Sequence, residues 1–126
     1  MHNLKAKKIW VAGARGMVGA AITRRLQSEN AVLLQDPPRT ELDLRRQTDV
    51  ETWMLINQPE IIFLAAARVG GILDNATHPA DFIADNLLIE TNIITTAAKL
   101  RIEKLVFLGS SCIYPKMAPQ PLKEEY

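Results

Sequence analysis

The sequence of 126 residues predicts a doubly wound α/β fold built on a parallel sheet. Strand-like and helix-like segments alternate along the chain, and the strand-like segments are apolar throughout instead of alternating with polar residues. Strands of this kind are buried on both faces, as in a parallel sheet covered by helices. With right-handed crossovers, we expect strand order 3-2-1-4 and a ligand crevice at the carboxyl ends, beside the junction of strands 1 and 4.

Four segments have the length and composition of strands. They lie at residues 8–12 (KIWVA), 31–35 (AVLLQ), 60–66 (EIIFLAA) and 105–108 (LVFL). The second is followed by Asp36-Pro37-Pro38, which should end it because proline supplies no backbone donor to a sheet.

Three helices are expected between these strands. The first has an apolar face formed by Val18, Ala21, Ile22 and Leu26. The second begins at the capping-box spacing of Thr48 and Glu51 and ends before Pro59. The third runs from Pro79 to about Lys99, and its apolar residues cover more than one face. Either another chain segment or a partner helix covers the far side, or some leucines are exposed.

Composition and charge narrow the classes of partner. A net charge of +1 and 48% hydrophobic residues describe an ordinary globular chain of one domain at most, with no nucleic-acid or membrane partner expected. The longest apolar run, residues 61–67, is far shorter than a membrane span. Cys112 is the single cysteine, which excludes an internal disulfide and suits a reducing compartment, so we expect a cytoplasmic protein.

A glycine-rich loop joins the first strand to the first helix. Residues 13–19 read G-x-x-G-x-x-G, the spacing of a dinucleotide-binding loop in the required strand–loop–helix context. The first glycine would permit a tight turn, the second a close approach of the pyrophosphate, and the third close packing of helix on sheet. Free N–H groups at the helix start would hold the phosphates. The alternative is a glycine-rich turn without a ligand.

The choice between NAD and NADP depends on three residues. Asp36 ends the second strand, where an acidic side chain would bind the ribose 2′-hydroxyl and favour NAD. Arg15 and Arg39 could instead bind a 2′-phosphate and favour NADP. The alternatives are that Asp36 points away as a turn residue and that the arginines are solvated surface charges. Two arginines against one carboxylate favour NADP.

The stretch FLGSSCIYP at residues 107–115 follows the fourth strand. It brings Ser110, Ser111 and the lone thiol of Cys112 to the carboxyl edge of the sheet. In isolation, the serines are interpreted as a turn or helix cap and the cysteine as a small buried thiol. At the edge where ligands bind, the same residues are candidates for catalysis.

Several stretches together resemble one protein family. They are VAGARGMVGAAI, RTELDL, AAARVGGI, HPADFI and FLGSSCIYPK, spread from residue 11 to about residue 121. The chain resembles the extended short-chain dehydrogenase/reductases, and within them the NADP-dependent 3,5-epimerase/4-reductases that convert GDP-4-keto-6-deoxy-D-mannose to GDP-L-fucose. Arg68 stands where many members of that group have lysine. The runner-up is an NAD(P)-dependent epimerase or dehydratase of another nucleotide sugar.

The resemblance implies a role for each matching residue. Ser110 would hydrogen-bond the C4 keto oxygen of the sugar, and Cys112 would be an acid/base in epimerisation. Arg15 and Arg39 would lie near the 2′-phosphate of NADPH, and no metal site is implied. The residues implied to hold the cofactor are Gly13, Ala14, Arg15, Gly16, Met17, Val18, Gly19, Arg39, Thr40, Glu41, Leu42, Asp43, Leu44, Leu108, Gly109, Ser110 and Ser111.

The resemblance also implies parts that these residues do not contain. The family's Tyr-x-x-x-Lys, its second epimerisation histidine and its substrate domain lie beyond Tyr126. We therefore expect residues 1–126 to be an NADP-binding Rossmann domain that is incomplete at its carboxyl terminus and inactive alone. The full-length protein would bind a GDP-sugar and form a homodimer. The competing hypothesis is a non-catalytic nucleotide-binding module.

Overall fold

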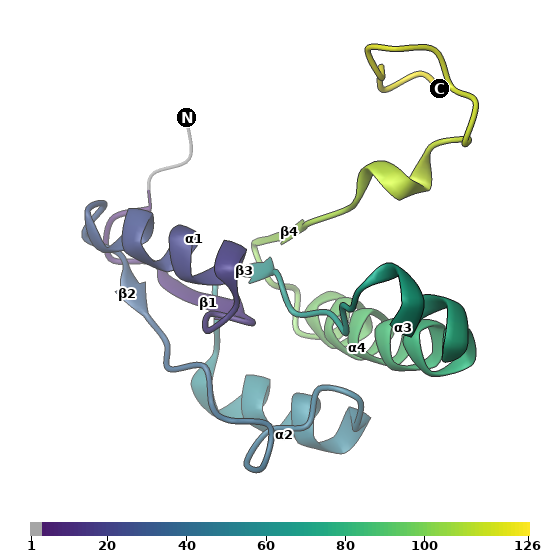
Figure 1. The fold of residues 1–126 in the computed structure, drawn as a ribbon. Helices are drawn as coiled ribbons and strands as arrows, with labels where there is room; N and C mark the ends of the chain where they lie inside the picture. The colour runs from purple at the N-terminus through teal and green to yellow at the C-terminus, as the bar shows by residue number, and fades with distance from the viewer. Residues whose placement is uncertain (1–3) are drawn as a thin grey trace.

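The computed structural model describes residues 4–126. It contains a four-stranded parallel sheet with helices on both faces (Figure 1). The strands are β1 (Lys8–Ala12), β2 (Val32–Leu33), β3 (Ile61–Leu64) and β4 (Lys104–Phe107). The helices are α1 (Met17–Gln27), α2 (Gln47–Asn57), α3 (Ile72–Thr77) and α4 (Pro79–Lys99), and a 3₁₀ turn spans Ser111–Ile113. The predicted doubly wound parallel class is confirmed. The short helix α3 was not predicted.

The strand order is β2-β1-β3-β4, so the predicted order 3-2-1-4 is wrong. The third strand pairs with β1 on the side away from β2, with Ile9 opposite Ile61 and Ala12 opposite Leu64. β3 is almost fully buried, so it needs a central position, and the two-residue β2 could not cover it at an outer edge. After β2 the chain therefore crosses to the other side of β1, where it adds β3 and then β4. The crevice between the loops that follow the strands then lies between β1 and β3.

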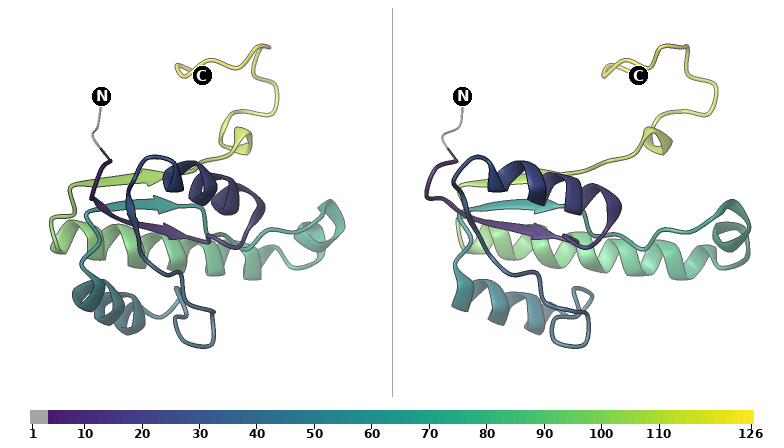
Figure 2. Two further views of the ribbon diagram at one scale, coloured as in Figure 1. Left: turned by 90° about the vertical axis from the view of Figure 1, so that its left-hand side faces the viewer. Right: turned by 60° about the vertical axis from the view of Figure 1, so that its left-hand side comes forward.

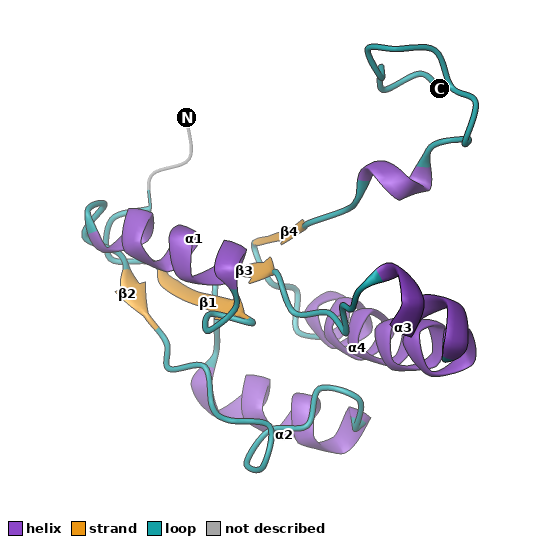
Figure 3. Ribbon diagram, viewed as in Figure 1, coloured by secondary structure: helices purple, strands orange, loops and turns teal. Residues whose placement is uncertain are grey.

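Two separate apolar cores lie on opposite faces of the sheet. Helices α2 and α4 cover one face, and α1 covers the other (Figures 2 and 3). On β1, Trp10 and Ala12 belong to the α2/α4 core, whereas Ile9 and Val11 belong to the α1 core. This division follows from strand geometry, because successive side chains point to opposite faces. From Ile9 to Ala12 in β1 and throughout β3, the central strands are therefore apolar on both faces.

The α1 side of the sheet is covered only in part. Leu26 is buried against β1 and β3, but Val18, predicted on the inward face, is 49% exposed. Phe107 of β4 is 47% exposed, and the carboxyl-terminal segment leads away from the sheet beyond it (Figure 1). The edge strand β4 therefore presents both an open edge and a half-open face.

Helix α4 has the predicted bounds and one buried face. Its inward residues are Phe82, Ile89, Asn92, Ile93, Thr96 and Ala97. Four further apolar residues of α4 are exposed: Ile83, Leu87, Leu88 and Ile94. Among residues 4–126, no helix combines the length and apolar character needed to cross a membrane.

Helix α2 starts differently from the prediction. Its first residue is Gln47, the preceding residue Arg46 makes no side-chain cap, and Thr48 lies within the first turn. It ends at Asn57, before Pro59 as predicted, and the next residue, Gln58, adopts a left-handed conformation (φ 50°). Val50 and Met54 are fully buried, and the ring of Trp53 packs 4.4 Å from that of Trp10.

Shortening a buried side chain on α4 should destabilise the fold strongly. Ile93 is fully buried, so Ile93→Ala should lower the free energy of unfolding by about 2–5 kcal/mol through lost contacts and a residual cavity. Ile94, its neighbour, is 41% exposed, and Ile94→Ala should cost less than about 1 kcal/mol. Urea titrations of both variants measure the difference, and equal losses would contradict a single buried face.

Candidate cofactor-binding site

The glycine loop is held where β1, α1 and the end of β3 meet. Gly13 has a φ of +89°, and a Cβ on it would lie 2.7 Å from the backbone nitrogen of Ala66. A Cβ on Gly19 would collide with the carbonyl oxygen of Gly13. The first and third glycines are thus required by the fold itself, because neither position has room for a side chain.

Gly16 has a different role in the same loop. It precedes the first residue of α1 in extended conformation, and its N–H donates to the Gly13 carbonyl at 3.0 Å. A Cβ there would approach only that carbonyl, at 3.4 Å. Its surface is exposed at the start of α1, where N–H groups and the helix dipole favour an anion.

Asp36 turns back towards this loop, so the alternative of a turn residue pointing away is wrong. One carboxylate oxygen accepts the N–H groups of Gly13 (3.2 Å) and Ala14 (3.1 Å), and the other accepts the indole N–H of Trp10 (3.1 Å). Burial raises the pKa of Asp36 above its ordinary value, and these hydrogen bonds and the charge of Arg15 oppose that rise only in part.

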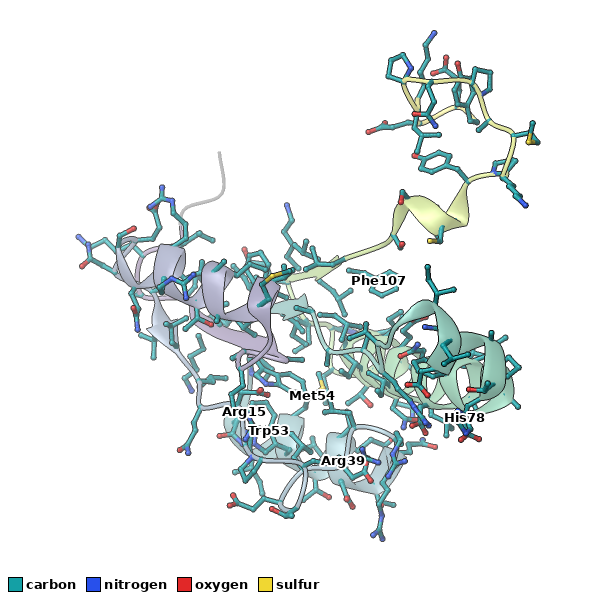
Figure 4. All side chains as sticks on the ribbon, in the orientation of Figure 1. Arg15, Arg39, Trp53, Met54, His78 and Phe107 are labelled. Atoms are coloured by element: carbon teal, nitrogen blue, oxygen red, sulfur yellow. The ribbon has the colours of Figure 1, made fainter. Side chains whose placement is uncertain are left out.

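Arg15 and Arg39 both lie at the edge of the sheet that carries the glycine loop (Figure 4). The Arg15 guanidinium donates to the Pro37 carbonyl at 3.0 Å, which ties the glycine loop to the end of β2. The Arg39 side chain is 66% exposed and lies 3.8 Å from the carboxylate of Asp43. Both guanidinium groups are therefore accessible to an anionic ligand beside the loop.

A cavity of about 360 Å³ opens between the glycine loop, the segment after β2, the end of β3 and α4. Of the predicted cofactor residues, those that line it are Gly13, Arg15, Gly16, Arg39, Leu42, Asp43 and Leu44. Other predicted residues lie outside its lining: Ala14, Met17, Val18, Gly19, Thr40, Glu41, Leu108, Gly109, Ser110 and Ser111. The structure thus brings the glycine loop and the segment after β2 together around one cavity. The residues after β4 are not part of its lining.

A chain of ion pairs lines the cavity wall, and sequence reasoning missed it. Arg45 bridges Asp43 (2.6 Å) and Asp85 (3.2 Å), and Asp85 also pairs with Arg68 (3.1 Å). Hydrogen bonding from Arg45 holds the pKa of Asp43 down at about 2. Burial alone would raise the pKa of Asp85, but the bonds from Arg45 and Arg68 lower it. No spacing in the sequence connects α4 to the segment after β2.

The loop after β3 is attached to α4 by contacts of Arg68 with residues of that helix. Asn86 accepts the Arg68 N–H at 2.7 Å and donates to the Arg68 carbonyl at 3.1 Å. The Arg68 guanidinium lies 4.7 Å from the centre of the Phe82 ring. Residues 65–68 therefore form a fixed wall of the cavity.

The Ser/Cys cluster follows β4 at the carboxyl edge of the sheet, as predicted from its position in the sequence. Ser110 precedes the 3₁₀ turn Ser111–Ile113, and its hydroxyl oxygen accepts the N–H of Cys112 at 3.2 Å. Both side chains are exposed, and Cys112 is a free thiol. The hydroxyl proton of Ser110 is still available for donation, since the oxygen is the acceptor in that bond.

This fold and loop define a Rossmann-like domain, and comparison with known proteins assigns it more closely. The model of the NAD dependent epimerase/dehydratase family matches residues 9–126. Because the match covers nearly the whole chain, this protein belongs to the NAD dependent epimerase/dehydratase family.

Named relatives cover the same region. A GDP-L-fucose synthase of Sinorhizobium fredii is 54% identical in an alignment that covers 99% of this chain and 40% of that protein. GDP-L-fucose synthase 1 of Arabidopsis thaliana is 54% identical over 95% of this chain and 37% of its own length. The solved structure of MlghC, a GDP-mannoheptose C4 reductase from Campylobacter jejuni with NADP bound, superposes with a TM-score of 0.90 at 38% identity, covering 100% of this chain and 39% of that one. The chain thus spans about two fifths of these relatives.

Adding a methyl group at the third glycine should disturb the loop. Gly19→Ala should lower the free energy of unfolding by about 1–3 kcal/mol, because the new Cβ would force the Gly13 carbonyl out of position. Gly71→Ala is the matched control, since nothing lies within 4 Å of a Cβ built there. Thermal unfolding compares the two, and a Gly19→Ala protein as stable as the control would contradict the close packing of α1 on β1.

Proposed function

We propose that this chain is the NADP(H)-binding part of an enzyme that converts GDP-4-keto-6-deoxy-D-mannose to GDP-L-fucose by 3,5-epimerisation and 4-reduction. The observation that carries the proposal is the cavity beside the glycine loop, in which two accessible arginines adjoin the start of α1. The relatives named GDP-L-fucose synthase, at 54% identity, support the choice of substrate.

The residues around the cavity fit a phosphorylated dinucleotide. Gly16 is exposed and has no side chain, so the backbone at the start of α1 is accessible there, and a pyrophosphate would accept N–H groups of the helix start. Arg15 and Arg39 would hold the 2′-phosphate at the end of β2. The bound nicotinamide would supply the hydride that reduces C4 of the sugar.

Ser110 and Cys112 would act on the sugar itself. The C4 ketone acidifies the protons at C3 and C5, and a thiol can remove and return such protons when its surroundings favour the thiolate. The Ser110 hydroxyl would donate to the C4 oxygen and stabilise the enolate, a role for which its proton is available. Because both side chains lie outside the cavity lining, their approach to the sugar is part of the proposal.

Assembly and location belong to the same proposal. The exposed apolar residues of α4, Ile83, Leu87, Leu88 and Ile94, suit a homodimer in which α4 packs on a second copy. A free, exposed thiol at Cys112 suits a reducing compartment, and we propose the cytoplasm.

A second candidate reaction is reduction of a GDP-sugar without epimerisation. The similarity to the GDP-mannoheptose C4 reductase, with a TM-score of 0.90, favours it. The two reactions differ in the need for an acid/base at C3 and C5, so the role of Cys112 separates them.

Nucleotide titration tests the cofactor assignment. In calorimetry, NADPH should bind more tightly than NADH. Arg39→Ala should lower the affinity for NADPH by about 10- to 100-fold, with less effect on the affinity for NADH, because a charged hydrogen bond to the 2′-phosphate is lost. Arg46→Ala, which removes an equally exposed guanidinium paired with Asp49, is the control and should bind like the parent. Failure of both nucleotides to bind would refute the cofactor assignment.

Deuterium exchange tests the epimerisation step. In the whole protein, Cys112→Ala should slow incorporation of solvent deuterium at C3 and C5 of GDP-4-keto-6-deoxy-D-mannose by about 100-fold or more, because a general acid/base is lost. NADPH affinity should not change. No exchange in the parent would favour the second candidate, and full exchange in the variant would show that another base acts.

A further inference from the structure

We infer that Asp36 is a positioning residue: its carboxylate holds the amino end of the glycine loop in place, and it does not select the cofactor by binding the adenosine ribose. This inference rests on the proposed cofactor function of the same loop. From the sequence alone, an acidic residue at this position predicts a preference for NAD.

The hydrogen bonds of Asp36 carry the first step. A carboxylate accepts about four hydrogen bonds, and three positions here are taken by donors of the protein. One oxygen receives the Gly13 N–H at 3.2 Å and the Ala14 N–H at 3.1 Å, the latter shared with the Val11 carbonyl at 3.1 Å, and the other oxygen receives the Trp10 indole at 3.1 Å. The carboxylate thus faces β1 and the loop.

The donors are themselves fixed, which makes the arrangement a constraint on the loop. Trp10 is fully buried, and its ring packs 4.4 Å from that of Trp53 on α2. Gly13 is confined by its left-handed φ of +89° and by the backbone of residues 65 and 66. Asp36 therefore links a rigid indole in the core to the two amides at which the loop begins.

Cofactor preference then depends on other groups. Arg15 reaches the Pro37 carbonyl at 3.0 Å, one residue past Asp36, and Arg39 extends beside the same cavity. NADP and NAD differ only at the 2′-phosphate, whereas both would need the loop in one conformation to bind the pyrophosphate. Loss of the Asp36 carboxylate should consequently lower the affinities for both nucleotides by the same factor.

The Asp36→Asn variant tests this role, because an amide retains the size of the side chain but turns one acceptor into a donor. We expect the amide hydrogen of Gly13 to exchange about 10-fold faster in the nucleotide-free chain, and that of Ala14 to be accelerated less because it keeps its bond to the Val11 carbonyl. The affinities for NADPH and NADH should fall equally, by about 10-fold. Exchange is followed by NMR and affinity by calorimetry. Glu125→Gln, which removes one charge from a 70% exposed side chain, is the control and should leave all four quantities unchanged.

A second variant covers failure of Asp36→Asn to fold. Trp10→Phe keeps an aromatic ring in the core and removes only the indole donor, so the same two amides should exchange faster, by about 3-fold, as the carboxylate loses one anchor.

Two results would overturn the inference. One is unchanged protection of Gly13 and Ala14 in both variants. The other is selective loss of NADH binding in Asp36→Asn with NADPH binding kept or improved, which is the signature of a ribose-binding carboxylate. If neither nucleotide binds the parent chain, the cofactor proposal fails, and amide exchange alone decides the role of Asp36.

Discussion

The close contact of three backbone segments at the end of β1 is the constraint on which the remaining structure depends. Gly13 turns against residues 65 and 66 at the end of β3, and Gly19 of α1 packs on the Gly13 carbonyl. The first contact needs β1 and β3 to be neighbours, as they are in the strand order, and the residues that make it line the cavity. A loop held in this way can present its amides to a phosphate with little cost of ordering.

Two carboxylates on the segment after β2 show how their surroundings set their tasks. Asp36 is more deeply buried, and its pKa is raised although three donors reach it. Asp43 is bonded by Arg45, and its pKa falls to about 2. The first carboxylate secures the loop, and the second begins an ion-pair chain that reaches Asp85 on α4. Together they connect β1, the segment after β2 and α4 around a single cavity.

Local patterns predicted much of this structure. The run KIWVA became β1 with the expected bounds, and the proline at residue 79 and the apolar pattern after it marked α4 to within its ends. The glycine spacing and Arg15 predicted a ligand site at the carboxyl edge of the sheet, and in the structure Gly13, Arg15 and Gly16 line a cavity. The inward face of α1 was predicted less well, since Val18 is 49% exposed. Periodicity gives a helix its apolar side but not the extent of its cover.

By itself, the sequence determined the parallel α/β class, the strand–glycine loop–helix unit and the presence of serine and thiol groups after the fourth strand, because each depends on neighbours in the chain. Only the tertiary structure decided which strand lies beside β1, where the Asp36 carboxylate points, and that Arg45 and Arg68 converge on Asp85. These features join residues that are far apart in the chain. The competition among burial, strand pairing and charge pairing that selects them has no local signature.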